Sequence, residues 1–169
     1  MAALLMQGQE IHTNGELPTV GGAAPLFVLT DEDLRDAALA DYRGATLIIN
    51  VVPSLDTPTC LVSTRRLSAQ IEDMPNTRLL VISADLPFAQ GRVLLEAEIT
   101  NVEPLSMMRD REFAIDYGLL IVDGPLRGIA ARALLVIDPN GIVVHAQLVA
   151  DIADEPDYAA AIAAANAAG

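Results

Sequence analysis

The stretch Ala45-Thr-Leu-Ile-Ile-Asn-Val-Val-Pro-Ser-Leu-Asp-Thr-Pro-Thr-Cys60 decides how this chain is expected to fold. Residues 45–52 are apolar almost throughout and rich in β-branched side chains, which is typical of a central strand covered on both faces. Pro53 ends that strand, and a short loop leads into a helix predicted from Thr59 to Asp73. A second apolar run follows at 77–83. The segment therefore predicts a strand–helix–strand unit with the usual right-handed crossover.

Elements predicted on either side of this unit complete an α/β protein. On the N-terminal side we expect a β-hairpin, a short strand and one helical turn capped by Thr30, over residues 3–20, 26–29 and 31–34. On the C-terminal side we expect a helix, an irregular or extended segment, a second helix, two antiparallel strands and a last helix, over 87–98, 104–108, 110–117, 133–137, 142–148 and 158–168. The pattern by itself indicates a mixed sheet.

Length and charge narrow the class of protein. A chain of 169 residues points to a single domain over 1–169. The net charge is −13 and every basic residue is an arginine, which argues against nucleic acids and anionic membranes as partners. No apolar run approaches the ~18–20 residues that a membrane helix requires, and the start lacks the basic segment of a secretory signal. We therefore expect a soluble protein of the cytoplasm.

Cys60 is the only cysteine, so an intramolecular disulfide and a cysteine-rich zinc site are both ruled out. Such a residue is an inert core side chain, a free thiol or a nucleophile. Its setting favours a nucleophile, because it follows a central strand at the start of a helix, where unpaired N–H groups and the helix dipole stabilise a thiolate. Thr57 brings a hydroxyl to the same turn, and Pro53 and Pro58 stiffen it. His12 and His145 stand apart in the sequence, so no metal or cofactor is expected.

The spacing Pro53-x-x-x-Thr57-x-x-Cys60 resembles the active-site signature of the peroxiredoxins. Three further segments are similar to the bacterial thiol peroxidase subfamily of that family: Ser83–Gln90, Asp123–Arg132 and Glu155–Tyr158. The resemblance runs in order from about residue 6 to residue 163. It implies a thioredoxin-like fold with a mixed central sheet, helices on both faces and an added N-terminal β-hairpin. It also implies a homodimer.

The resemblance assigns roles to individual residues. Cys60 would be the cysteine that attacks the hydroperoxide, Thr57 would hydrogen-bond the peroxide, and Pro53 would shape the site. Arg132 would stabilise the thiolate and the oxygen charge that develops in the transition state, a task that suits a fixed, multiply donating cation. Arg132 lies between two apolar segments, and a charge in that position favours a role in the active site. A surface or ion-paired arginine is the alternative. Arg65 is a weaker candidate that equally fits a solvated helix face.

The chain departs from the subfamily at one position that matters. The resolving cysteine is expected at residue 94, where this chain has Leu94. A sulfenate at Cys60 would then be reduced by an external thiol such as thioredoxin, glutathione or a small thiol. Resolution by Cys60 of another subunit, or a variant with an altered resolving site, are the other interpretations. A thiol peroxidase is the leading functional hypothesis. A peroxide sensor that passes oxidation to a partner protein, and a thioredoxin-fold interaction protein without activity, are the alternatives.

Overall fold

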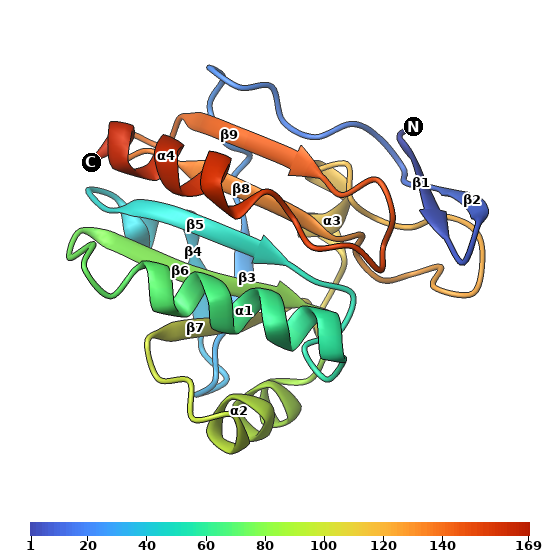
Figure 1. The fold of residues 1–169 in the computed structure, drawn as a ribbon, viewed down its shortest axis with the longest axis horizontal. Helices are drawn as coiled ribbons and strands as arrows, with labels where there is room; N and C mark the ends of the chain where they lie inside the picture. Colours follow the sequence, from blue (N-terminus) through green and yellow to red (C-terminus); the bar gives the residue numbers. More distant parts are fainter.

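A mixed seven-stranded sheet organises the structure (Figure 1). The computed structural model describes residues 1–169. Its strands are β1 (Ala3–Met6), β2 (Gln9–His12), β3 (Val28–Thr30), β4 (Asp36–Ala38), β5 (Thr46–Val51), β6 (Thr77–Ser83), β7 (Val102–Ser106), β8 (Ala133–Ile137) and β9 (Val143–Leu148). Its helices are α1 (Pro58–Gln70), α2 (Pro87–Glu96), α3 (Glu112–Asp116) and α4 (Tyr158–Ala168), with a 3-10 turn at η1 (Leu39–Tyr42).

The predicted strand–helix–strand unit is the centre of the sheet. The strands lie in the order β4-β3-β7-β6-β5-β8-β9. β5 is parallel to β6 and antiparallel to β8, and every residue of β5 is buried. The C-terminal end of β5 therefore lies beside both the end of β6 and the start of β8. This arrangement brings three segments that are distant in sequence to one edge of the sheet.

Alternate residues of β5 face two separate apolar cores, as expected for a strand covered on both sides. On one face Ile48 packs with Leu67 of α1 and Ala161 of α4. Figure 1 shows these two helices lying along that face. On the other face Leu47 packs with Phe113 of α3. The predicted thioredoxin-like fold with helices on both faces is thus confirmed.

The predictions were wrong for residues 31–34, and they missed β4. Thr30 does not cap a helical turn but closes β3. Asp31 accepts hydrogen bonds from the N–H groups of Asp33 and Arg35 at 2.9 and 2.8 Å, and the left-handed φ of 64° at Leu34 completes a tight turn into β4. An aspartate that bonds to nearby backbone amides in this way competes with helix formation.

The segment 104–108, for which the sequence left an irregular or an extended structure open, is extended as far as Ser106, and Met107 and Met108 lie beyond the strand. Most of this segment belongs to β7, which pairs in parallel with β6. Pro104 is accommodated because the other side of β7 pairs with β3 only through Ser106, opposite Thr30. A proline is tolerated in a strand where its missing N–H would face no partner.

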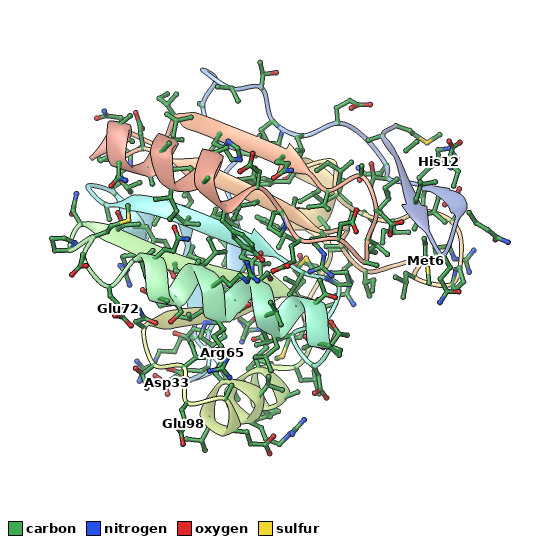
Figure 2. The ribbon with its side chains drawn as sticks, viewed as in Figure 1. Met6, His12, Asp33, Arg65, Glu72 and Glu98 are labelled. Carbon is green, nitrogen blue, oxygen red and sulfur yellow. The ribbon has the colours of Figure 1, made fainter.

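The N-terminal hairpin of β1 and β2 lies outside the main sheet, and Figure 2 shows Met6 and His12 on it at one side of the molecule. His12 joins the hairpin to the segment between α3 and β8, because its N–H and its Nδ1 each lie 2.7 Å from an oxygen of Asp123. The hydrogen bond to Asp123 raises the pKa of His12 and lowers the pKa of Asp123. None of the helices combines the length and apolar character needed to cross a bilayer.

Candidate active site

Cys60 lies in the first turn of α1, just beyond the C-terminal end of β5. Thr57 occupies the N-cap position without a side-chain hydrogen bond to the helix, and Pro58 is the first helical residue. Backbone N–H groups at this end have no carbonyl partner within the helix, and the helix dipole favours an anion there by about 0.3–1 kcal/mol when exposed and up to ~2 kcal/mol when partly buried. The Cys60 side chain is a free thiol with 0% exposure. The sulfur therefore lies at the end of the helix where the free N–H groups are, inside the protein.

Arg132 reaches Cys60 because β8 pairs with β5, which places Ala133 opposite Val51. Nη1 of Arg132 lies 3.3 Å from Sγ of Cys60. Nε and Nη2 of the same guanidinium donate to the carbonyl oxygen of Ile152 at 3.0 and 2.9 Å, which fixes its plane. The side chain of Arg132, just before β8, thus connects the first turn of α1 to the segment after β9.

The charge of Arg132 is buried and has no carboxylate partner. Its side chain is only 2% exposed, and none of the ion pairs in the structure includes it. A buried cation is costly unless it is paired. The sulfur of Cys60 is the only side-chain atom to which Arg132 hydrogen-bonds. Arg132 is therefore neither a surface residue nor an ordinary ion-paired arginine.

Thr57 and Pro53 bound the loop that leads to Cys60. The Thr57 hydroxyl donates to the carbonyl oxygen of Ser54 at 3.1 Å, and no hydrogen bond joins it to the sulfur. Its oxygen lone pairs stay available to accept a hydrogen bond from another molecule. Pro53 is buried and follows directly on the central strand. Residues 53–57 are called the active-site loop from here on.

A buried polar cluster that the sequence analysis missed supports the first turn of α1. The carbonyl oxygen of Cys60 accepts hydrogen bonds from the hydroxyls of Ser63 and Thr64, both at 2.9 Å. Asn50 of β5 donates to those two hydroxyls at 3.1 and 3.2 Å. The cluster anchors the helix to the strand beneath it. The one signal in the sequence is Asn50 itself, an amide in the middle of the run 45–52, whose only other polar side chain is Thr46.

Neither Leu94 nor Arg65 belongs to the hydrogen-bonded groups around Cys60. Leu94 is 6% exposed and belongs to the same apolar cluster as Cys60, so α2 contributes an apolar side chain to that cluster where the family resemblance implies a thiol. Arg65 lies exposed on α1 (Figure 2), and its side chain takes part in no ion pair or hydrogen bond.

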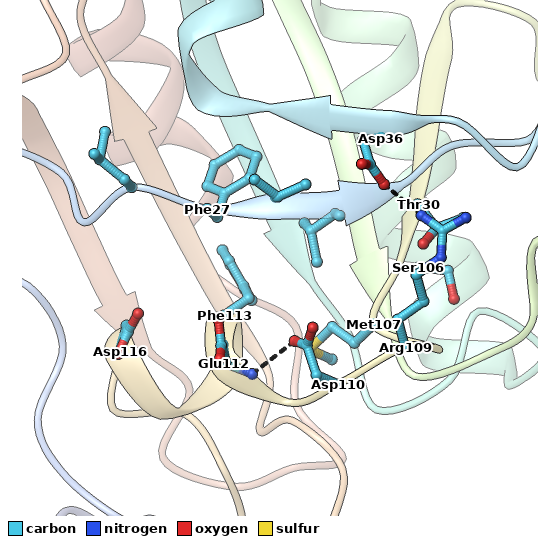
Figure 3. A pocket seen from close by; sticks show the side chains of 13 residues that line it. Phe27, Thr30, Asp36, Ser106, Met107, Arg109, Asp110, Glu112, Phe113 and Asp116 are labelled. Carbon is cyan, nitrogen blue, oxygen red and sulfur yellow. Dashed lines mark hydrogen bonds and ion pairs between the residues drawn. The ribbon is translucent and has the colours of Figure 1, made fainter.

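Two hollows of the protein surface lie apart from the sulfur. Figure 3 shows a hollow of about 370 Å³ beside β3 and β4, where Arg109 pairs with Asp36. Another hollow, of about 290 Å³, lies between Thr59 and the segment around Asp154. Cys60 lines neither of them. A molecule that reacts with the sulfur must therefore displace atoms of the active-site loop or of the first turn of α1.

This chain belongs to the Redoxin family, which residues 19–162 match. It is 42% identical over 166 residues to the thiol peroxidase of Corynebacterium glutamicum, covering 98% of this chain and 100% of the relative. It is 44% identical over 167 residues to the thiol peroxidase of Mycobacterium tuberculosis, covering 99% and 100%. The structure is similar to that of a peroxiredoxin-like protein from Aquifex aeolicus, with a TM-score of 0.93, 34% identity, and coverage of 99% of this chain and 97% of the other.

Proposed function

We propose that the protein is a thiol-dependent peroxidase that reduces hydrogen peroxide and alkyl hydroperoxides through Cys60. The observation that carries this proposal is the buried guanidinium of Arg132, 3.3 Å from the only thiol and without a carboxylate partner. A cation in that position is best satisfied when the sulfur is ionised. The thiolate is the form of cysteine that attacks an oxygen–oxygen bond. The names of the relatives agree with this activity.

The reaction divides into two steps that balance. In the first, the Cys60 thiolate attacks one oxygen of the hydroperoxide, the O–O bond breaks, and the departing oxygen takes up a proton to leave as water or an alcohol. Cys60 is now a sulfenic acid. In the second step an external thiol attacks the sulfenate sulfur, water leaves, and a mixed disulfide forms. A further thiol on the reductant then releases Cys60 as the thiol and carries away the disulfide.

Three residues assist Cys60 in this proposal. Arg132 stabilises the thiolate and then the charge that grows on the departing oxygen. The hydroxyl of Thr57 donates its hydrogen bond to the carbonyl oxygen of Ser54, so its oxygen is left to accept a hydrogen bond from the peroxide O–H. This hydrogen bond orients the two peroxide oxygens in line with the sulfur. Pro53 gives the active-site loop its shape.

An external reductant follows from Leu94 at the position of the resolving cysteine. Thioredoxin or another thiol of the cytoplasm would serve, acting on a homodimer of this chain. The intermediate sulfenate cannot be captured by a second thiol of the same chain, because Cys60 is the only cysteine. Direct thiol reduction is therefore the simplest complete cycle.

The test is the rapid reaction of the reduced protein with cumene hydroperoxide, followed by trapping of the sulfenate with dimedone. We expect stoichiometric labelling at Cys60, formed much faster than with free cysteine and greatly slowed in Thr57→Val and Arg132→Ala. Arg65→Ala is the matched control, since this arginine is exposed on the same helix. Reaction no faster than that of free cysteine would exclude a peroxidase and leave a scaffold with a structural thiol.

A peroxide sensor is the second candidate, and the absence of another cysteine favours it more strongly here than in a family member that carries a resolving cysteine. In that function oxidised Cys60 passes its oxidation to a cysteine of a partner protein. Multiple turnovers with a small thiol or thioredoxin support the peroxidase. Rapid oxidation that stops after a single turnover with every such reductant supports the sensor.

A further inference from the structure

A carboxylate from the neighbouring strand end holds the active-site loop. Asp85 follows β6, and its Oδ1 accepts a hydrogen bond from the hydroxyl of Ser54 at 2.8 Å. Its Oδ2 accepts from the N–H of Leu55 and from the hydroxyl of Ser83, both at 2.7 Å. One side chain thus joins the loop after β5 to the loop after β6. Nothing in the spacing of the peroxiredoxin-like signature points to it.

The carboxylate of Asp85 has no cationic partner. It is half-buried and takes part in none of the ion pairs of the structure, so its hydrogen bonds all come from neutral donors. Hydrogen bonds to an ionised acceptor are shorter and stronger than neutral ones. Its hydrogen bonds reach the active-site loop at Ser54 and Leu55, and none of them reaches Cys60. The benefit of Asp85 to the site is therefore geometric rather than electrostatic.

The geometry that Asp85 fixes extends to Thr57. Ser54 is held through its side chain by Asp85, and its carbonyl oxygen accepts the hydrogen bond of Thr57. The anchor is itself braced from α2, because the buried side chain of Gln90 donates to the hydroxyl of Ser83 at 2.9 Å. A chain of hydrogen bonds thus leads from Gln90 in the interior to the hydroxyl of Thr57.

We propose that Asp85 is a positioning residue for the peroxide step, which holds Ser54 and thereby orients Thr57 toward the two oxygens of the peroxide. The proposal rests on the function proposed above, since it uses the role given there to Thr57. Without Asp85 the loop shifts, and a misplacement of about 1 Å can cost about 100-fold in rate. Alkylation of Cys60 by iodoacetamide requires no alignment of two oxygens and does not share this loss.

The experiment compares the two reactions of Cys60 in matched variants. The variants are Asp85→Ala, Asp85→Asn and the control Asp138→Ala. Asp138 is also half-buried and also anchors a loop, accepting from the N–H groups of Asn140 and Ile142 at 2.9 and 2.8 Å, but it lies at the other end of β8. Rates with cumene hydroperoxide and with iodoacetamide are measured separately, and thermal unfolding confirms that each variant is folded.

We expect Asp85→Ala to lower the peroxide rate about 100-fold while the alkylation rate stays equal or rises. Asp85→Asn should lose less, because its amide oxygen can still accept from Leu55, and it decides the question if Asp85→Ala does not fold. An unchanged peroxide rate in the Asp85 variants overturns the proposal, as does an equal loss in Asp138→Ala. A wild-type protein that is itself no faster than free cysteine instead overturns the peroxidase, and this proposal with it.

Discussion

Replacing Arg132 by alanine is expected to slow the reaction of Cys60 with hydroperoxides much more than it weakens the fold. The guanidinium is 2% exposed, lies 3.3 Å from the sulfur and has no carboxylate partner. Removing one fixed donor that faces developing charge in a buried site lowers a rate by about 100- to 1000-fold, equivalent to about 2.7–4 kcal/mol. Arg132→Lys keeps the charge, but a lysine ammonium cannot hydrogen-bond the carbonyl of Ile152 and the sulfur with one rigid planar group. Its rate should therefore lie between those of the wild type and Arg132→Ala.

The assay is quenched-flow oxidation by cumene hydroperoxide with mass-spectrometric detection of the dimedone adduct. This readout is needed because the chain has no tryptophan to report the reaction by fluorescence. Arg66→Ala is the control, since Arg66 is exposed and its ion pair with Glu155, at 3.2 Å, does not involve the sulfur. An Arg132→Ala protein that is folded and reacts as fast as the wild type would refute the reasoning about the buried cation.

Three further outcomes are expected. Excess peroxide should inactivate the enzyme progressively by over-oxidation of Cys60, since no second thiol of the chain captures the sulfenate; activity that survives many equivalents without added thiol contradicts this. Leu94→Cys should lose about 1–3 kcal/mol of stability but form a disulfide with Cys60 after equimolar peroxide; non-reducing peptide mapping that finds only sulfenate and its over-oxidised products contradicts it. His145→Gln should remove part of the stability loss that the wild type shows as the pH falls below 6.5, because burial lowers the pKa of His145 and the folded state therefore favours its neutral form. Urea titrations at several pH values measure that difference, and parallel curves for the two proteins would contradict it.

The sequence predicted the centre of the fold better than its edge. The run 45–52 and the run at 77–83 are long and apolar, so their burial between two layers was readable from composition alone. β4 was missed because Asp36–Ala38 is too short and too weakly patterned to show a period. The paired part of β7 was obscured by Pro104, whose compatibility with a strand depends on which neighbour lies beside it.

The candidate site divides in the same way. The local signals at Cys60 and Thr57 were visible because a helix start after a buried strand has known electrostatics. Arg132 is distant in sequence and could be linked to Cys60 only through the family resemblance, since its approach depends on the pairing of β8 with β5. Asp85 and Asn50 were not predicted, because their roles consist of hydrogen bonds to other loops and helices that no spacing along the chain encodes.

The complete burial of Cys60 makes its reactions depend on the local opening of the first turn of α1. Because Cys60 is 0% exposed, we expect a bulky thiol to reach the sulfur only in the fraction of molecules in which that turn has opened. The hydrogen bonds from Ser63 and Thr64 to the carbonyl of Cys60 favour the closed form. Each added 1.4 kcal/mol of closure would make the open form about tenfold rarer. These contacts therefore prolong the time that a sulfenate at Cys60 waits for a bulky reductant.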